Sequence, residues 1–229
     1  MKLPKRGADA LVYSLPLIGY GVVAVFLGMR HREMMNADAM VYIRRAGYLL
    51  HGDFYYFLSE HWSLMLSWLI APLMAMGIDG LYAARIVNGC IGALYMVCFL
   101  ALARRLLVVH WVWHLLSGIV IAPFIATVAI RGISPDLLLA VWLVLYMTIV
   151  LSPRWAESGG RQFLSGIVGG FAYLAKAFAF PFVIVHLIMT LLILAARERG
   201  QRDGNSAARG QGNLLGRVGL AYARALRAR

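Results

Sequence analysis

Residues 86–103 read IVNGCIGALYMVCFLALA, eighteen consecutive residues without a charged side chain. An α-helix rises 1.5 Å per residue, so a run of this length approaches the ~30 Å thickness of the hydrocarbon core of a bilayer. Polar and apolar residues do not alternate along it, as they would in a transmembrane β-strand. The stretch therefore predicts a transmembrane helix.

Further uncharged runs lie on both sides of this one, at Ala10–Met29, Leu106–Ile130, Leu137–Pro153, Gln162–Ala175 and Ala177–Ala196. Hydrophobic residues make up 62% of the 229 residues and charged residues 14%, whereas soluble domains are about a quarter charged. We therefore predict an all-α, polytopic transmembrane bundle of about six spans. It occupies residues 1–196, and a basic tail, residues 197–229, follows.

The positions of the basic residues predict the orientation. If the amino terminus is cytoplasmic, fifteen of the 22 Lys and Arg residues lie on that side: in residues 2–6, at 104–105, at 154 and 161, and beyond residue 196. This is the positive-inside pattern of membrane proteins. It predicts a multi-pass protein of the inner (plasma) membrane with both termini in the cytoplasm. It also accounts for the net charge of +12 without nucleic acid, which we do not expect as a partner.

One uncharged segment, His61–Ile78, is long enough to cross the membrane, but we do not interpret it as a span. Counting it as a span would invert every later segment and place Arg104 and Arg105 outside. Its tryptophans and Pro72 suit a helix that lies at the membrane surface. We therefore predict that the outer first loop, residues 30–80, contains interfacial helices.

Asp38 is the candidate catalytic carboxylate of this loop. It lies in an apolar neighbourhood, with no basic residue within the preceding helical turn. Such a carboxylate could act as a general base or help to hold a divalent cation. The alternative is a helix cap near Asn36. Glu60 and His61 could add metal ligands, although an adjacent Glu-His pair alone is weak evidence.

Two other polar places are predicted on the same outer side. In the turn Arg131–Asp136, the sequence Ser-Pro-Asp indicates the start of a helix, so Asp136 could serve only as a capping residue. Lys176 ends an apolar run, where a lysine commonly extends its ammonium group toward water. For Arg44 and Arg45, contact with lipid headgroups is the simplest expectation.

The order of these features resembles the amino-terminal part of the GT-C-fold membrane glycosyltransferases, the superfamily that includes protein O-mannosyltransferases, aminoarabinose transferases and glycosyltransferase family 39. The resemblance runs through most of residues 10–196. It is carried by the order and spacing of the segments Asn36–Tyr42, Gly47–Asp53, Leu81–Asn88, Ser134–Ala140 and Gly169–Phe178.

The resemblance implies an enzyme that transfers a sugar from a polyprenyl-phosphate-linked donor to a lipid, glycan or protein acceptor at the outer face. The family's first-loop catalytic carboxylate corresponds to Asp38, and Asp136 and Lys176 correspond to substrate-binding positions. Arg131 or Lys176 would stabilise the leaving lipid phosphate. Family members continue with further spans, so the resemblance also implies that this chain is their amino-terminal portion. The expected substrate-binding set is completed by Tyr42, Arg44 and His61.

Two other functions remain open from the sequence. One is a non-catalytic assembly or flipping protein that binds a polyprenyl phosphate. The other is a transporter, which would place ionisable groups at mid-membrane on broken helices. The six predicted spans are almost free of such groups, which counts against transport.

The charge distribution makes the topology testable. Reporter fusions after Arg105 and Arg161 should give a cytoplasmic signal, and fusions near Asp53 and Gly132 should give an outer signal, because the positive side of the chain is retained inside. A cytoplasmic signal from the Asp53 fusion would contradict the predicted orientation.

Overall fold

A computed structural model describes residues 5–58, 63–107, 110–152, 154–196 and 199. All regular structure in these residues is helical, as predicted. The chain divides into two units, Met1–Phe180 and Pro181–Arg229. Among the described residues, the helices long and apolar enough to cross a membrane are Ala10–Arg30, Gly80–Leu106, Trp111–Arg131 and Ala179–Ala196. The protein is therefore a helical membrane protein.

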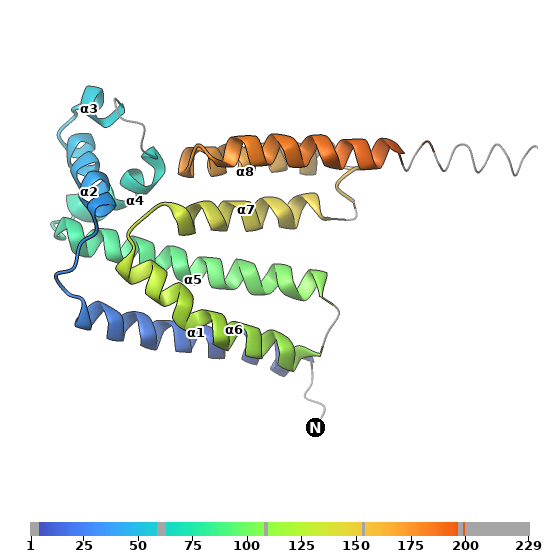
Figure 1. Cartoon of the computed structure of the whole chain (residues 1–229), viewed down its shortest axis with the longest axis horizontal. Helices are drawn as coiled ribbons and strands as arrows, with labels where there is room; N and C mark the ends of the chain where they lie inside the picture. Colours follow the sequence, from blue (N-terminus) through green and yellow to red (C-terminus); the bar gives the residue numbers. More distant parts are fainter. Residues whose placement is uncertain (1–4, 59–62, 108–109, 153, 197–198, 200–229) are drawn as a thin grey trace, which may run out of the picture. The chain divides into compact units, whose positions relative to one another are not determined.

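The long helices of the first unit lie alongside one another and alternate in direction (Figure 1). Helix α6 packs against α1 and α5, while α7 packs against α5 and α8. This alternation brings alternate chain connections to the same end of the unit. The helices are α1 (Lys5–Arg30), α5 (Gly80–Leu106), α6 (Trp111–Arg131), α7 (Asp136–Val150) and α8 (Gly159–Ala175).

Three short helices, α2 (Ala37–Leu50), α3 (Phe54–Leu58) and α4 (Leu64–Ala75), gather at one end of the unit (Figure 1). Helix α2 packs against α4, and both contact α5. The twelve residues of α4 would extend only about 18 Å, well short of a bilayer core. The predicted helix in residues 61–78 therefore exists without the length of a span. Its position at the membrane surface stays a prediction.

Two of the last predicted spans form helices that are shorter than an average transmembrane span. Helices α7 and α8 have 15 and 17 residues, fewer than the ~20 of an average span, so the count of six stays a prediction. On α8, Gly169 is buried, whereas Gly166 and Gly170 are exposed with nothing within 4 Å of an added Cβ. The predicted basic tail lies outside the described residues, apart from Arg199.

Buried polar side chains on α5 satisfy backbone carbonyls where other helices end. Arg85, only 6% exposed, donates to three carbonyls just beyond α1, each at 2.5 Å. Asn88 donates to the carbonyls of Ala129, at 2.7 Å, and Gly132, at 3.3 Å, at the end of α6. Terminal carbonyls have no partner within their own helix, and no water in hydrocarbon. These bonds therefore fix α1 and α6 to α5.

Two substitutions of glycines on α5, one of them a control, test the packing of α1, α5 and α6. A Cβ at Gly92 would lie 2.3 Å from the hydroxyl oxygen of buried Tyr20, which donates to the Gly89 carbonyl at 2.6 Å. Gly92→Ala should therefore lower the free energy of unfolding in detergent by about 1–3 kcal/mol. In the control Gly89→Ala, the nearest atom lies 3.9 Å from the new Cβ, so stability should change by less than about 1 kcal/mol. Equal effects would contradict this packing.

Candidate functional site

A cavity of about 150 Å³ lies at the end of the first unit that carries the short helices. Its walls come from α2, the residue before α4, the turn between α6 and α7, and the end of α8. Asp38, Asp136 and Lys176, which the sequence predicts on one side of the membrane, all line it. The full lining is Asp38, Tyr42, Ser63, Pro135, Asp136, Lys176, Ala177 and Phe178.

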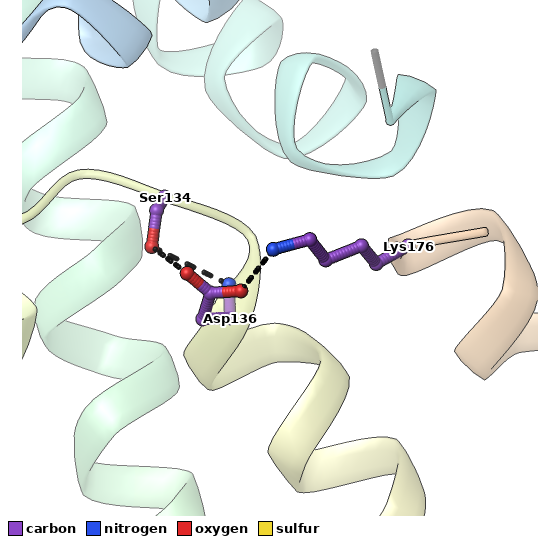
Figure 2. Close-up of polar contacts among 3 residues, drawn as sticks. All are labelled: Ser134, Asp136 and Lys176. Atoms are coloured by element: carbon purple, nitrogen blue, oxygen red, sulfur yellow. Dashed lines mark hydrogen bonds and ion pairs between the residues drawn. The ribbon is translucent and has the colours of Figure 1, made fainter. Parts of the chain in front are cut away.

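Asp136 and Lys176 form an ion pair, with Lys176 Nζ 2.5 Å from Asp136 Oδ1. Figure 2 shows the two side chains meeting from α7 and from the residue after α8, while the Ser134 hydroxyl donates to Asp136 Oδ2 at 3.0 Å. The side chains are 56% exposed for Asp136 and 34% for Lys176. Exposed pairs of this kind stabilise a fold only weakly, so the contact chiefly positions charge at the cavity.

The pKa of the Asp136 carboxyl is lowered from its ordinary value of 3.8. Partial burial alone would raise this pKa, but the hydrogen bonds from Lys176 and Ser134 outweigh it. The carboxylate therefore remains ionised at neutral pH and offsets the charge of Lys176. The cavity holds a neutralised pair beside the second carboxylate, Asp38.

Asp38 lies in the first turn of α2, and Asn36 occupies the position before the helix. Asp38 is therefore a first-turn residue, where a carboxylate also favours the amino-terminal end of a helix, as the capping alternative expects. The Asn36 side chain makes no capping bond; its Nδ2 donates instead to the Ile133 carbonyl at 3.1 Å. This bond fixes the start of α2 to the turn that leads into Asp136, and so holds the two carboxylates at one cavity.

Ser63 makes the corresponding connection on the other side of the cavity. Its Oγ donates to the Leu174 carbonyl at 2.9 Å, which joins the start of α4 to the end of α8. Lys176 follows two residues later, with Nζ 5.8 Å from the Phe178 ring centroid, in range of a cation–π contact. Sequence reasoning missed Ser63 and Phe178. A serine before an apolar helix signals only a cap, and nothing in the sequence indicates a bond to a distant carbonyl.

Tyr42, an expected binding residue, does line the cavity and is 1% exposed. Burial raises the pKa of its hydroxyl, and the negative charges of Asp38 and Asp136 raise it further. The hydroxyl therefore stays protonated at neutral pH.

Other expected site residues lie elsewhere. Arg131, at the end of α6, and Arg44, on α2, are exposed and are not among the residues that line the cavity. Glu60 and His61 lie outside the described residues. Among the described residues, no group of three or more His, Cys, Asp and Glu side chains could hold a metal ion. A divalent cation therefore stays an expectation.

The expectation that Arg45 contacts lipid headgroups is wrong. Its side chain is 0% exposed, and Nε donates to the Phe57 carbonyl at 3.1 Å. The guanidinium carbon lies 5.6 Å from the Phe57 ring centroid. Neighbouring helical residues point about 100° apart, so Arg44 faces outward while Arg45 is directed inward to fix α3 against α2.

The geometry defines a helical membrane protein with a small charged cavity at one end of its bundle. The chain matches no family model, no curated protein and no solved structure.

The lowered pKa of Asp136 predicts a pH-dependent contribution to stability. A depressed folded pKa contributes stability above the ordinary value of 3.8 and loses it as the pH falls through the lowered value. Asp136→Asn should therefore destabilise the protein by about 0.2–1 kcal/mol at pH 7, with the difference vanishing in acid. Thermal unfolding in detergent between neutral and acid pH measures this. The exposed control Asp53→Asn should follow wild type throughout; a constant Asp136→Asn deficit would contradict the ion-pair account.

Proposed function

We propose that this chain is a membrane glycosyltransferase, or the amino-terminal part of one, that uses a polyprenyl-phosphate-linked sugar donor. The observation that supports this proposal is the convergence of Asp38, Asp136 and Lys176 on one cavity. Two carboxylates and an ammonium group at the end of a transmembrane bundle can serve both halves of a sugar transfer. One carboxylate can accept a proton, and the cation can bind the phosphate.

In the proposed reaction, an acceptor hydroxyl oxygen attacks the anomeric carbon while Asp38 takes the hydroxyl proton. The bond between the anomeric carbon and the phosphate oxygen breaks, and its electron pair leaves with the polyprenyl phosphate. The ammonium group of Lys176 stabilises that negative charge. The products are the glycosylated acceptor, the polyprenyl phosphate and a protonated Asp38, which returns its proton to water.

The cavity dimensions limit what this part of the chain would bind alone. Its volume of about 150 Å³ is below the ~300–1,000 Å³ of typical ligand pockets. We infer that it receives only the reacting groups, and that the donor phosphate competes with Asp136 for Lys176. The polyprenyl chain would extend into the bilayer beside the helices.

The orientation belongs to the same proposal. Arg105 donates to the Thr148 carbonyl at 2.9 Å and Arg161 to Ser152 at 2.6 Å. These residues lie at the last turns of α5 and α7 and the first turn of α8, which are the helix ends remote from Asp136 and Lys176. With the positive side inside, the cavity would open on the outer face of the inner (plasma) membrane and both termini would be cytoplasmic. The lipid, glycan or protein acceptor would then come from that side.

A second candidate is a non-catalytic protein that binds a polyprenyl phosphate for assembly or flipping. The Lys176–Asp136 contact of 2.5 Å also fits this candidate, because Lys176 could exchange Asp136 for a phosphate without any covalent bond being broken. The two candidates differ in turnover. Only the enzyme would release polyprenyl phosphate from the sugar-linked donor.

The substitution Asp38→Asn distinguishes them. In proteoliposomes of the full-length protein supplied with a polyprenyl-phosphate-linked sugar and membrane acceptors, the variant should lose ~10²–10⁴-fold in rate, the usual effect of removing a general base. Its affinity for polyprenyl phosphate should remain near wild type, because the lysine is intact. Release of the lipid phosphate measures the rate, and binding of the labelled lipid measures the affinity.

The exposed carboxylate Asp53 provides the control for that experiment. It lies between α2 and α3 and does not line the cavity, so Asp53→Asn should transfer sugar at the wild-type rate. Near wild-type transfer by a folded Asp38→Asn variant would refute the catalytic assignment. Lipid binding by wild type without any transfer would favour the non-catalytic candidate.

A further inference from the structure

A larger groove of about 720 Å³ lies between α1, α5 and α6 in the first unit. It shares no lining residue with the Asp38 cavity. The glycosyltransferase proposal assigns it no part. Its lining is Ala24, Val25, Gly28, Met29, Arg32, Tyr82, Arg85, Ile86 and Ile130.

The walls of the groove are apolar and belong to candidate membrane-spanning helices. Val25 and Met29 of α1 and Ile86 of α5 all present exposed side chains there. Gly28 leaves the groove open, because an added Cβ would meet nothing within 4 Å. An extended hydrocarbon chain fits such a surface through many weak dispersion contacts.

The mouth of the groove carries two positive charges. Arg32 is exposed, and its Nε donates to the Tyr82 hydroxyl at 2.6 Å. The terminal nitrogens of Arg32 form no hydrogen bond with any described residue. Arg85 is buried, with its terminal nitrogens bonded to backbone carbonyls at the end of α1. Within the part of the chain that the structure describes, neither arginine forms an ion pair with a carboxylate.

The positions of these charges along the helices indicate that the ligand is a lipid. Arg32 lies just beyond the end of α1, and Tyr82 and Arg85 lie in the first turns of α5. The ends of spanning helices lie at the level of lipid headgroups, where arginine and tyrosine commonly anchor. A planar guanidinium with free terminal nitrogens matches the paired oxygens of a phosphate.

We propose that this groove binds a membrane phospholipid with an anionic headgroup. Its phosphate accepts hydrogen bonds from the terminal nitrogens of Arg32, within the field of Arg85. One acyl chain lies in the groove, past Gly28 and along Val25 and Ile86. Arg32 and Arg85 together leave a net positive charge at the mouth even with the carboxylate of Glu33 next to Arg32, which favours a lipid of net negative charge over a zwitterionic one. This site is independent of sugar transfer at the Asp38 cavity.

Native mass spectrometry of the purified full-length protein tests the proposal, with dioleoylphosphatidylglycerol and dioleoylphosphatidylcholine as probes. Wild type should retain one phosphatidylglycerol in preference to phosphatidylcholine. Arg32→Gln should weaken that retention about ten-fold, the effect of losing a charge-assisted contact. The matched control is Arg30→Gln, which removes a charge from the end of α1 but outside the groove, and it should bind as wild type does.

A second variant pair tests the acyl-chain position without changing charge. Gly28→Leu fills the groove and should reduce retention of phosphatidylglycerol about ten-fold. Gly21→Leu, on the same helix and equally free of neighbours within 4 Å, lies outside the groove and should have no effect. Equal losses in Arg30→Gln and Arg32→Gln, wild-type binding by Gly28→Leu, or displacement of the lipid by inorganic phosphate alone would each overturn the proposal.

Discussion

A charged side chain at the centre of a bilayer costs about 2.5–3.5 kcal/mol of free energy even on the mildest measured scale. This cost explains where the ionisable side chains of the first unit lie. Its apolar helices carry their ionisable groups at or near their ends. Because the helices alternate in direction, the carboxyl-terminal ends of α1, α6 and α8 and the amino-terminal ends of α5 and α7 meet on one side (Figure 1). The short helices α2 to α4 cover that side and turn a set of helix ends into a cavity.

The same constraint explains how the cavity is held. Carbonyls at helix ends have no partner in their own helix, and here several receive a donor from another element. Two of these bonds bracket the site, Asn36 to Ile133 beside Asp38 and Ser63 to Leu174 beside Lys176. The charged groups are therefore positioned by backbone ties that cost no additional charge. Elsewhere in the unit, the neutral side chain of Asn88 and the charged side chains of Arg45 and Arg85 donate to backbone carbonyls in the same way.

The sequence was sufficient for the helical class and for placing Asp38, Asp136 and Lys176 on one side, because assigning spans determines which chain segments share a side. It was not sufficient to predict the hydrogen bonds to backbone carbonyls that hold these residues in place. The partner of Ser63 is a backbone carbonyl 111 residues away, and a carbonyl carries no residue signature. The inward direction of Arg45 was missed because adjacent arginines look alike in a sequence, whereas packing on α3 selects one of them.

The proposed function depends most on Asp38 and Lys176 facing the same cavity, and cross-linking in native membranes measures this directly. In a chain lacking Cys90 and Cys98, cysteines replacing Asp38 and Lys176 should be joined within one molecule by a short bismaleimide reagent. A matched pair replacing Asp38 and Arg105 should remain unlinked, since Arg105 lies near the opposite end of α5. Absence of the first link, or equal yields from the two pairs, would contradict the proposed arrangement.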